Sequence, residues 1–128
     1  MNPQEIFLSD YKKPEFEVIN IDLCFKLDPE KTIVSSEIKF KRIKNNPNIV
    51  PSLILDGKNL KLISVAIDGI KLDQNSYKLL KDKLEILPNK ITNSEFKLNC
   101  ITEINPKDNT ALEGLYLSEG IYCTQCEP

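Results

Sequence analysis

The chain of 128 residues contains no histidine and no tryptophan, and it has only four glycines and one methionine. Without histidine it cannot form the His-Glu-x-x-His zinc site of a metallopeptidase or a Ser-His-Asp triad. Four scattered glycines do not build a phosphate-binding loop. We therefore expect this chain to be catalytically inactive by itself and to hold no metal ion.

A strong charge of one sign is also missing, and so are long apolar runs. The 17 basic and 19 acidic residues are interspersed, which gives a net charge of −2 and no basic field for nucleic acid. No apolar run approaches the ~18 residues of a membrane span. The first ten residues lack the basic start and apolar core of a secretory signal. The expected protein is cytoplasmic and has neither nucleic acid nor membrane as a partner.

The four cysteines, Cys24, Cys100, Cys123 and Cys126, leave three interpretations open. The Cys-x-x-Cys pair at 123–126 is compatible with half of a zinc site, with a redox motif, or with neither. A four-cysteine zinc site would need Cys24 and Cys100, which lie within predicted strands. A redox motif should open a helix, and no helix-forming run follows here. Free thiols that fill small spaces in a reducing compartment are the favoured interpretation.

The body of the sequence consists of short segments in which apolar and polar residues alternate, the pattern of β-strands. In the first, Ile19, Ile21, Leu23, Phe25 and Leu27 alternate with polar residues, which predicts a half-buried strand. The expected strands are 16–27, 32–42, 53–55, 60–67, 70–72, 77–80, 84–87 and 95–104. In 60–67, the pattern places Ile63, Val65 and Ile67 on one side.

Turn signals separate these segments. Asp68-Gly69 and Lys81-Asp82-Lys83 predict hairpins, and Asp28-Pro29-Glu30-Lys31 predicts a turn between the first two strands. Seven to nine short strands without a convincing helix predict an all-β sandwich or saddle of antiparallel and mixed sheets. Residues 1–14 are expected to form an N-terminal arm and residues 15–128 the β-domain.

The C-terminal stretch is the part that packing explains least. It runs from Asn109 through Leu112-Glu113-Gly114 to Tyr122-Cys123-Thr124-Gln125-Cys126-Glu127. In an extended segment Gln125 and Glu127, two residues apart, project from the same face. An amide beside a carboxylate suits a primary ammonium group, which offers three donors. The alternative is a solvated strand end without a ligand.

The run NTALEGLYLS…YCTQCE resembles the end of the N-terminal β-domain of the zinc aminopeptidase N family. The segment 11–28, YKKPEFEVINIDLCFKLD, is similar to the opening strand of that domain, and 31–34 and 56–62 fall where its next strands lie. The resemblance covers most of residues 10–127. It implies a non-catalytic part of a longer bacterial zinc-dependent aminopeptidase, which removes N-terminal amino acids from peptides.

The resemblance also implies particular roles and partners. Glu127 would bind the free α-amino group of the substrate, and Gln125 would line the first substrate pocket. The zinc ion would be held in the catalytic domain of the parent, and the partners would be that domain and peptides with a free N-terminus. The family's domain has further strands after TQCE, so one sheet edge should be open here, and some apolar surface should be exposed.

Two other interpretations remain. One is a stand-alone β-sandwich module for binding or scaffolding, without an enzymatic parent. The other is an aminopeptidase-like protein that has kept the fold and lost catalysis.

Overall fold

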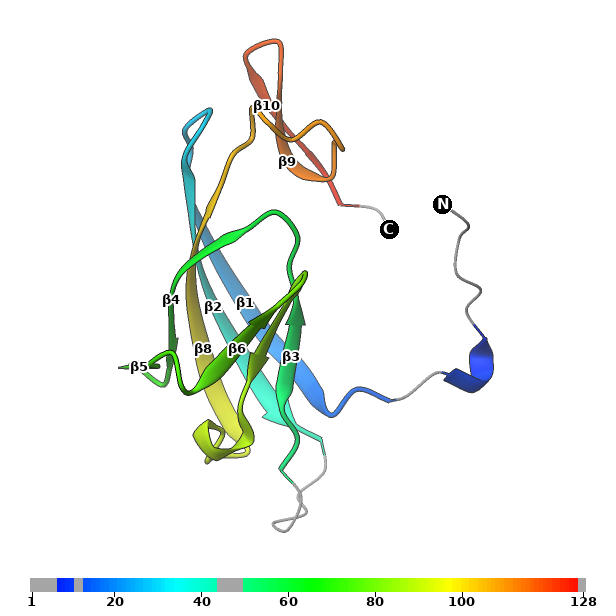
Figure 1. Ribbon diagram of the computed structural model, residues 1–128, viewed down its shortest axis with the longest axis vertical. Coiled ribbons are helices and arrows are strands. Elements are labelled where there is room, and N and C mark those ends of the chain that lie inside the picture. Colours follow the sequence, from blue (N-terminus) through cyan, green and yellow to red (C-terminus); the bar gives the residue numbers. More distant parts are fainter. Residues whose placement is uncertain (1–6, 11–12, 44–49, 127–128) are drawn as a thin grey trace.

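The computed structural model describes residues 7–10, 13–43 and 50–126 and consists of three antiparallel sheets of five, three and two strands. The orders are β1-β2-β8-β4-β5, β3-β7-β6 and β10-β9 (Figure 1). The strands are β1 (Phe16–Lys26), β2 (Thr32–Arg42), β3 (Leu53–Asp56), β4 (Lys61–Ile67), β5 (Ile70–Lys71), β6 (Tyr77–Leu80), β7 (Lys83–Ile86), β8 (Glu95–Ile104), β9 (Gly114–Ser118) and β10 (Ile121–Gln125).

The predicted all-β class is confirmed, and the described residues form ten strands instead of seven to nine because the C-terminal stretch folds into a hairpin of its own. Every pairing in the described part of the chain is antiparallel, so the expected mixed sheets are not found there. The described helices are two single 3₁₀ turns, Leu8–Asp10 and Pro88–Lys90. Within these ranges, no helix has the length and apolar character needed to cross a membrane.

Among the described residues, three two-residue turns connect neighbouring strands as hairpins. Asp68 and Gly69 have φ angles of 49° and 81°, and Glu119 and Gly120 have φ angles of 50° and 80°. Positive φ at both central positions matches the right-handed twist of the flanking strands. The β6–β7 hairpin turns at Lys81-Asp82, where Asp82 has a φ of 58°. The two hairpins predicted at Asp68-Gly69 and Lys81-Asp82-Lys83 are confirmed.

The core lies where the three-stranded sheet covers one half of the five-stranded sheet (Figure 1). Phe40 of β2 is directly opposite Phe96 of β8, and their rings stack with centroids 5.5 Å apart. Leu53 and Ile86 come from the covering sheet. The alternating pattern predicted for β2 and β8 is confirmed, because the inward positions of both strands supply the buried side chains.

Two β-bulges change the faces that the sequence pattern predicts. The pairing register of β1 shifts between Val18 and Asn20, and that of β4 shifts between Leu62 and Ser64. Each bulge inserts one extra residue, which interrupts the regular alternation of side chains. Ile63 is therefore exposed, and Leu62 packs against the core in its place. The prediction that Ile63 shares the core face of Val65 is wrong.

The prediction that β1 buries one of its two faces is also wrong, because every residue of this strand after Phe16 is exposed. Ile19, Ile21, Leu23, Phe25 and Leu27 are each 45–55% exposed. The cause is position: β1 is the outermost strand of its sheet, and Phe16 is the one described side chain of this strand that packs against the core. The resemblance implies that some apolar surface is exposed, and β1 provides such a surface.

Candidate functional site

The C-terminal hairpin carries the predicted site residue Gln125. In this hairpin Tyr116 is opposite Cys123, Leu115 is opposite Thr124, and Gly114 is opposite Gln125. Cys123 thus lies within a strand, and the chain turns at Glu119-Gly120. Gly114 has a φ of 72°, a conformation that a residue with a side chain adopts only under strain. This glycine lets the chain enter β9 opposite Gln125.

Asn109 holds the start of the hairpin. Its side-chain Nδ2 donates to the carbonyl oxygens of Glu113 at 2.7 Å and Leu115 at 2.8 Å. The backbone N–H of Leu117 donates to the carbonyl of Pro106 at 3.2 Å. These contacts tie the hairpin to the segment that leaves β8, so a side-chain amide and the backbone fix its position together.

The turn between β1 and β2 supports this segment from the other side. The N–H of Lys107 donates to the carbonyl of Pro29 at 2.9 Å. Within the turn, the Asp28 carboxylate accepts the N–H groups of Glu30 and Lys31. These backbone donors hold the pKa of Asp28 below its ordinary value, because they favour the charged form. The predicted turn at 28–31 is confirmed, and it helps to position the hairpin.

The two faces of β10 have different surroundings. Thr124 and Cys126 line an apolar groove on the inner side of the sheets. Gln125 lies between them in an extended strand, so its side chain projects from the opposite face, where it is exposed. Glu127 lies outside the described residues, and its expected alignment with Gln125 stays a prediction. The described part of the candidate amine site thus faces away from the groove.

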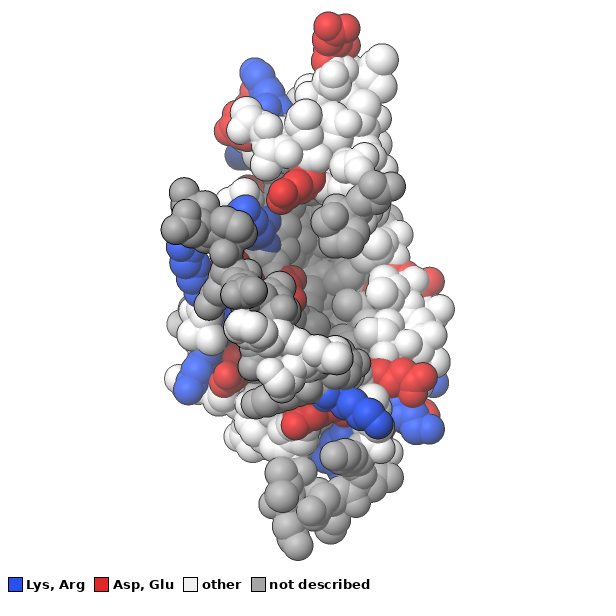
Figure 2. Space-filling model, turned by 90° about the vertical axis from the view of Figure 1, so that its right-hand side faces the viewer, with Lys and Arg blue, Asp and Glu red and all other residues white. Residues whose placement is uncertain are grey.

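The groove has a volume of about 580 Å³ and a mainly apolar lining. It lies between the uncovered half of the five-stranded sheet, the β6–β7 hairpin and the C-terminal hairpin. Figure 2 views the molecule from the side and shows a hollow at mid-height, with charged side chains mainly around its rim. Its apolar lining includes Leu23, Phe25, Val34, Ile38, Leu60, Leu79, Leu80 and Leu115. Such a surface can bind apolar groups, and the charged residues in its lining are Asp56, Asp82 and Lys83.

Sequence patterns did not identify this groove. Its walls come from segments far apart in the chain, and only the fold brings them together. One local feature of the sequence does indicate an apolar surface near a hairpin end: Leu79 and Leu80 are adjacent and directly precede the charged turn Lys81-Asp82. Adjacent residues of a strand point to opposite faces, so two neighbouring leucines place an apolar side chain on each face of β6.

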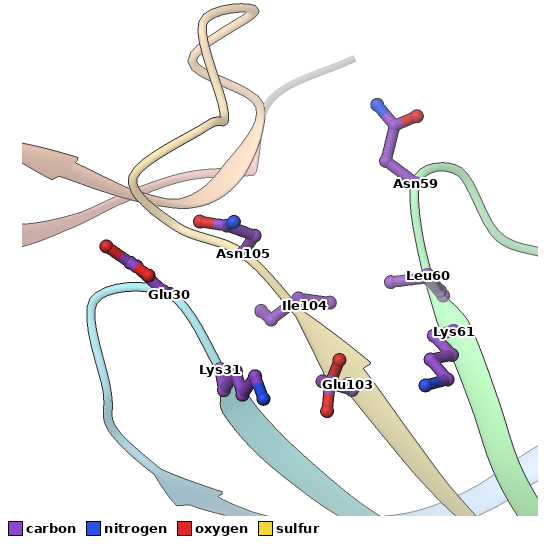
Figure 3. Close-up of a pocket in the computed structure, with 8 residues that line it drawn as sticks. All are labelled: Glu30, Lys31, Asn59, Leu60, Lys61, Glu103, Ile104 and Asn105. Atoms are coloured by element: carbon purple, nitrogen blue, oxygen red, sulfur yellow. The ribbon is translucent and has the colours of Figure 1, made fainter.

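A second, polar cleft of about 450 Å³ lies at one end of the five-stranded sheet. Figure 3 shows Lys31 and Lys61 on either side of Glu103. None of the side chains in the cleft is buried, and Glu30 pairs with Lys107 outside it at 3.3 Å. The arrangement is that of solvated charges on a strand face.

The cysteines do not form a four-cysteine site among the described residues. Cys24 is opposite Ser35 and Cys100 is opposite Ser36, so the two thiols project from opposite faces of the same sheet. In the described ranges no three His, Cys, Asp or Glu side chains are placed to hold a metal ion. The zinc interpretation of the Cys-x-x-Cys pair therefore lacks its other two ligands there.

The thiols are expected to differ sharply in reactivity. Burial raises the pKa of Cys100 from 9.0 to about 11, whereas Cys24 and Cys126 are exposed. Since the thiolate is the nucleophile, Cys100 should react roughly 100-fold more slowly or not at all with Ellman's reagent at pH 8. Titration in native buffer and in guanidinium chloride measures this. Cys100→Ala should remove only the thiol that appears on unfolding, and a loss of a fast thiol instead would contradict the assignment.

No protein-family model matches the chain. Three bacterial aminopeptidase N sequences do: those of Caulobacter vibrioides (40% identical over 127 residues), Haemophilus influenzae (40% over 128) and Escherichia coli (37% over 125). The alignments cover 94–98% of this chain but only 13–14% of the relatives. The chain therefore spans about one seventh of their length.

Solved structures agree with these sequences. The structure of Legionella pneumophila aminopeptidase A in complex with aspartic acid is 32% identical in sequence and has a TM-score of 0.77. The match covers 94% of this chain and 14% of the aminopeptidase A chain. Two structures of yeast leukotriene A4 hydrolase have TM-scores of 0.59 and 0.63, at sequence identities of 23% and 22%. These matches cover 79% and 90% of this chain, and 16% and 20% of the hydrolase chains. At such identities they support the fold alone. The chain thus matches the N-terminal β-domain of the aminopeptidase N family along nearly its whole length.

Proposed function

We propose that this chain is the non-catalytic N-terminal domain of a zinc-dependent aminopeptidase that removes N-terminal amino acids from peptides. The observation that supports this most is the 40% identity to aminopeptidase N over 98% of the chain. An identity of that size over a whole domain reflects common descent, although the chain spans only 14% of that relative.

The domain's own residues do not fit a zinc ion. The sequence has no histidine, and the described residues bring no three candidate ligands together. In this proposal zinc belongs to the remainder of the parent protein. The domain contributes recognition of the substrate and no catalytic group.

Glu127 is the proposed anchor for the α-ammonium group of the substrate, and Gln125 is proposed to shape the pocket for the first side chain. An ammonium group donates three hydrogen bonds, and a carboxylate is the acceptor that binds it most strongly. Gln125 is exposed on the face of β10 that does not line the groove, so it is free to contact a neighbouring domain or a peptide. A charged contact of this kind contributes about 1.5–3 kcal/mol.

The exposed apolar surface is the proposed contact with the rest of the parent. Leu23 and Phe25 of β1 are 55% and 45% exposed, and both line the apolar groove. An apolar patch of this kind on a folded domain marks an interaction site. The groove also favours a second candidate, a stand-alone module that binds an apolar ligand there.

A substrate comparison tests the proposal. The longer protein that contains this domain should cleave a peptide with a free N-terminus at least about ten-fold more efficiently than the same peptide acetylated at that end, because acetylation removes the cation. The isolated chain should cleave neither. Equal cleavage of both peptides would contradict amine recognition, and the absence of peptidase activity in the longer protein would favour the binding module.

A further inference from the structure

The C-terminal hairpin is a two-stranded sheet that shares no strand pairing with the two larger sheets in the described part of the chain (Figure 1). A hairpin of this size is at best marginally stable by itself. The turn at Glu119-Gly120 closes one of its ends. The other end is open, and the last pair there is Gly114 and Gln125. Because strand ends open first, the position of Gln125 depends on what holds this pair.

Asn109 holds the open end on both sides of Gly114. Its Nδ2 donates to the carbonyl oxygen of Glu113 at 2.7 Å and to that of Leu115 at 2.8 Å. These residues are the neighbours of Gly114 along the chain, and Gly114 is the partner of Gln125. One amide group therefore uses both of its N–H donors to fix the backbone opposite Gln125.

The loop between Asn109 and β9 has a backbone conformation that must be held in place. Leu112 has a φ of 57°. This left-handed conformation is uncommon for leucine and persists only where the surrounding structure enforces it. The Leu112 side chain is 51% exposed, so its packing contributes little. The two hydrogen bonds from Asn109 close the loop across Leu112, and they provide the restraint.

We propose that Asn109 is a positioning residue for the substrate pocket, a role that rests on the proposed function. By holding Gly114, Asn109 determines where the side chain of Gln125 lies, and thereby the preference of the longer protein among first side chains. Asn109 itself does not contact the substrate. Its loss should let the pair of Gly114 and Gln125 open, so that Gln125 occupies several positions and discriminates less well.

A ratio of two specificities measures this role in the longer protein. The kcat/KM for leucine amide is divided by that for arginine amide. Both substrates carry the same ammonium group, so a change in amine binding cancels in the ratio. Asn109→Ala should change the ratio at least about five-fold, in the same direction as Gln125→Ala. Asn109→Asp keeps the size of the side chain, but its ionised form has no donor, so it should act alike.

A double variant separates positioning from a general structural role. If Asn109 acts through Gln125, adding Asn109→Ala to Gln125→Ala should change the ratio no further, because the side chain that it positions is already absent. Effects that multiply would mean that the two residues act independently, and would overturn the proposal.

Asn99→Ala is the matched control. It removes another half-buried asparagine amide, which donates to Glu37 within the five-stranded sheet. This variant should leave the ratio unchanged, and an effect equal to that of Asn109→Ala would overturn the proposal. Hydrogen exchange of the same proteins shows where the structure has opened. In Asn109→Ala, peptides that cover 114–126 should exchange faster, whereas those that cover β2 and β8 should not change.

The remaining outcomes distinguish this inference from the proposed function. If Gln125→Ala changes the ratio and neither Asn109 variant does, the positioning role is overturned and the proposed function stands. If Gln125→Ala has no effect, the pocket role of Gln125 fails and the positioning role fails with it. Loss of protection throughout the domain in both Asn109 variants would mean that Asn109 is needed for folding, which would also overturn the proposal.

Discussion

Leu98→Ala is expected to lower the free energy of unfolding by about 3 kcal/mol and the melting temperature by roughly 10–15 °C. Leu98 is 0% exposed at the centre of the sheet, where β8 places it between Ile38 of β2 and Ile67 of β4. Truncation leaves a cavity among strands that are held in register by their hydrogen bonds, so the surrounding side chains cannot close it. Urea unfolding of the isolated chain measures the effect.

Ile101→Ala is the matched control for this prediction. Ile101 lies on the same strand but on the polar face, where it is 36% exposed. Its truncation should cost less than about 1 kcal/mol, because only part of the side chain leaves an apolar environment. Comparable losses of unfolding free energy at both positions would contradict the assignment of Leu98 to the buried face and of Ile101 to the exposed face of the five-stranded sheet.

Removal of the Glu127 carboxylate is expected to lower kcat/KM of the longer protein about ten- to a hundred-fold. The anchor pairs with a charge that every peptide with a free N-terminus carries, so the loss should be similar for different first residues. Gln125→Ala should behave differently and change the preference among first side chains, because the glutamine is proposed to line their pocket. An aminoacyl-amide series with several side chains separates the two effects.

Much of the fold was predictable from local pattern. β2 and β8 begin and end where the alternation does, at Thr32–Arg42 and Glu95–Ile104, because both have one face in the core. Hairpins followed from Asp68-Gly69 and Lys81-Asp82, since Asp68, Gly69 and Asp82 tolerate the positive φ that these tight turns need. Here local chemistry and tertiary packing favour the same conformation.

The remaining features depend on contacts that local patterns do not encode. The alternation in β1 is as regular as in β2, but burial depends on whether another layer covers the strand. The bulges at Ile19 and Ile63 reflect how neighbouring strands fit together, and both residues are apolar like their neighbours. The groove combines residues from both ends of the chain. At the candidate site, the extended conformation of Gln125 was predicted correctly, whereas the role of Glu127 rests on the resemblance.

The measurement that tests the central claim most directly is kcat/KM of the longer protein on an aminoacyl amide, wild type against Glu127→Ala. Zinc content and melting temperature are compared in the same preparations, so that loss of the metal or of the fold is recognised. A loss of ten-fold or more with both properties unchanged is the result expected if Glu127 binds the substrate amine. An unchanged kcat/KM would contradict that role and leave the domain with a purely structural one.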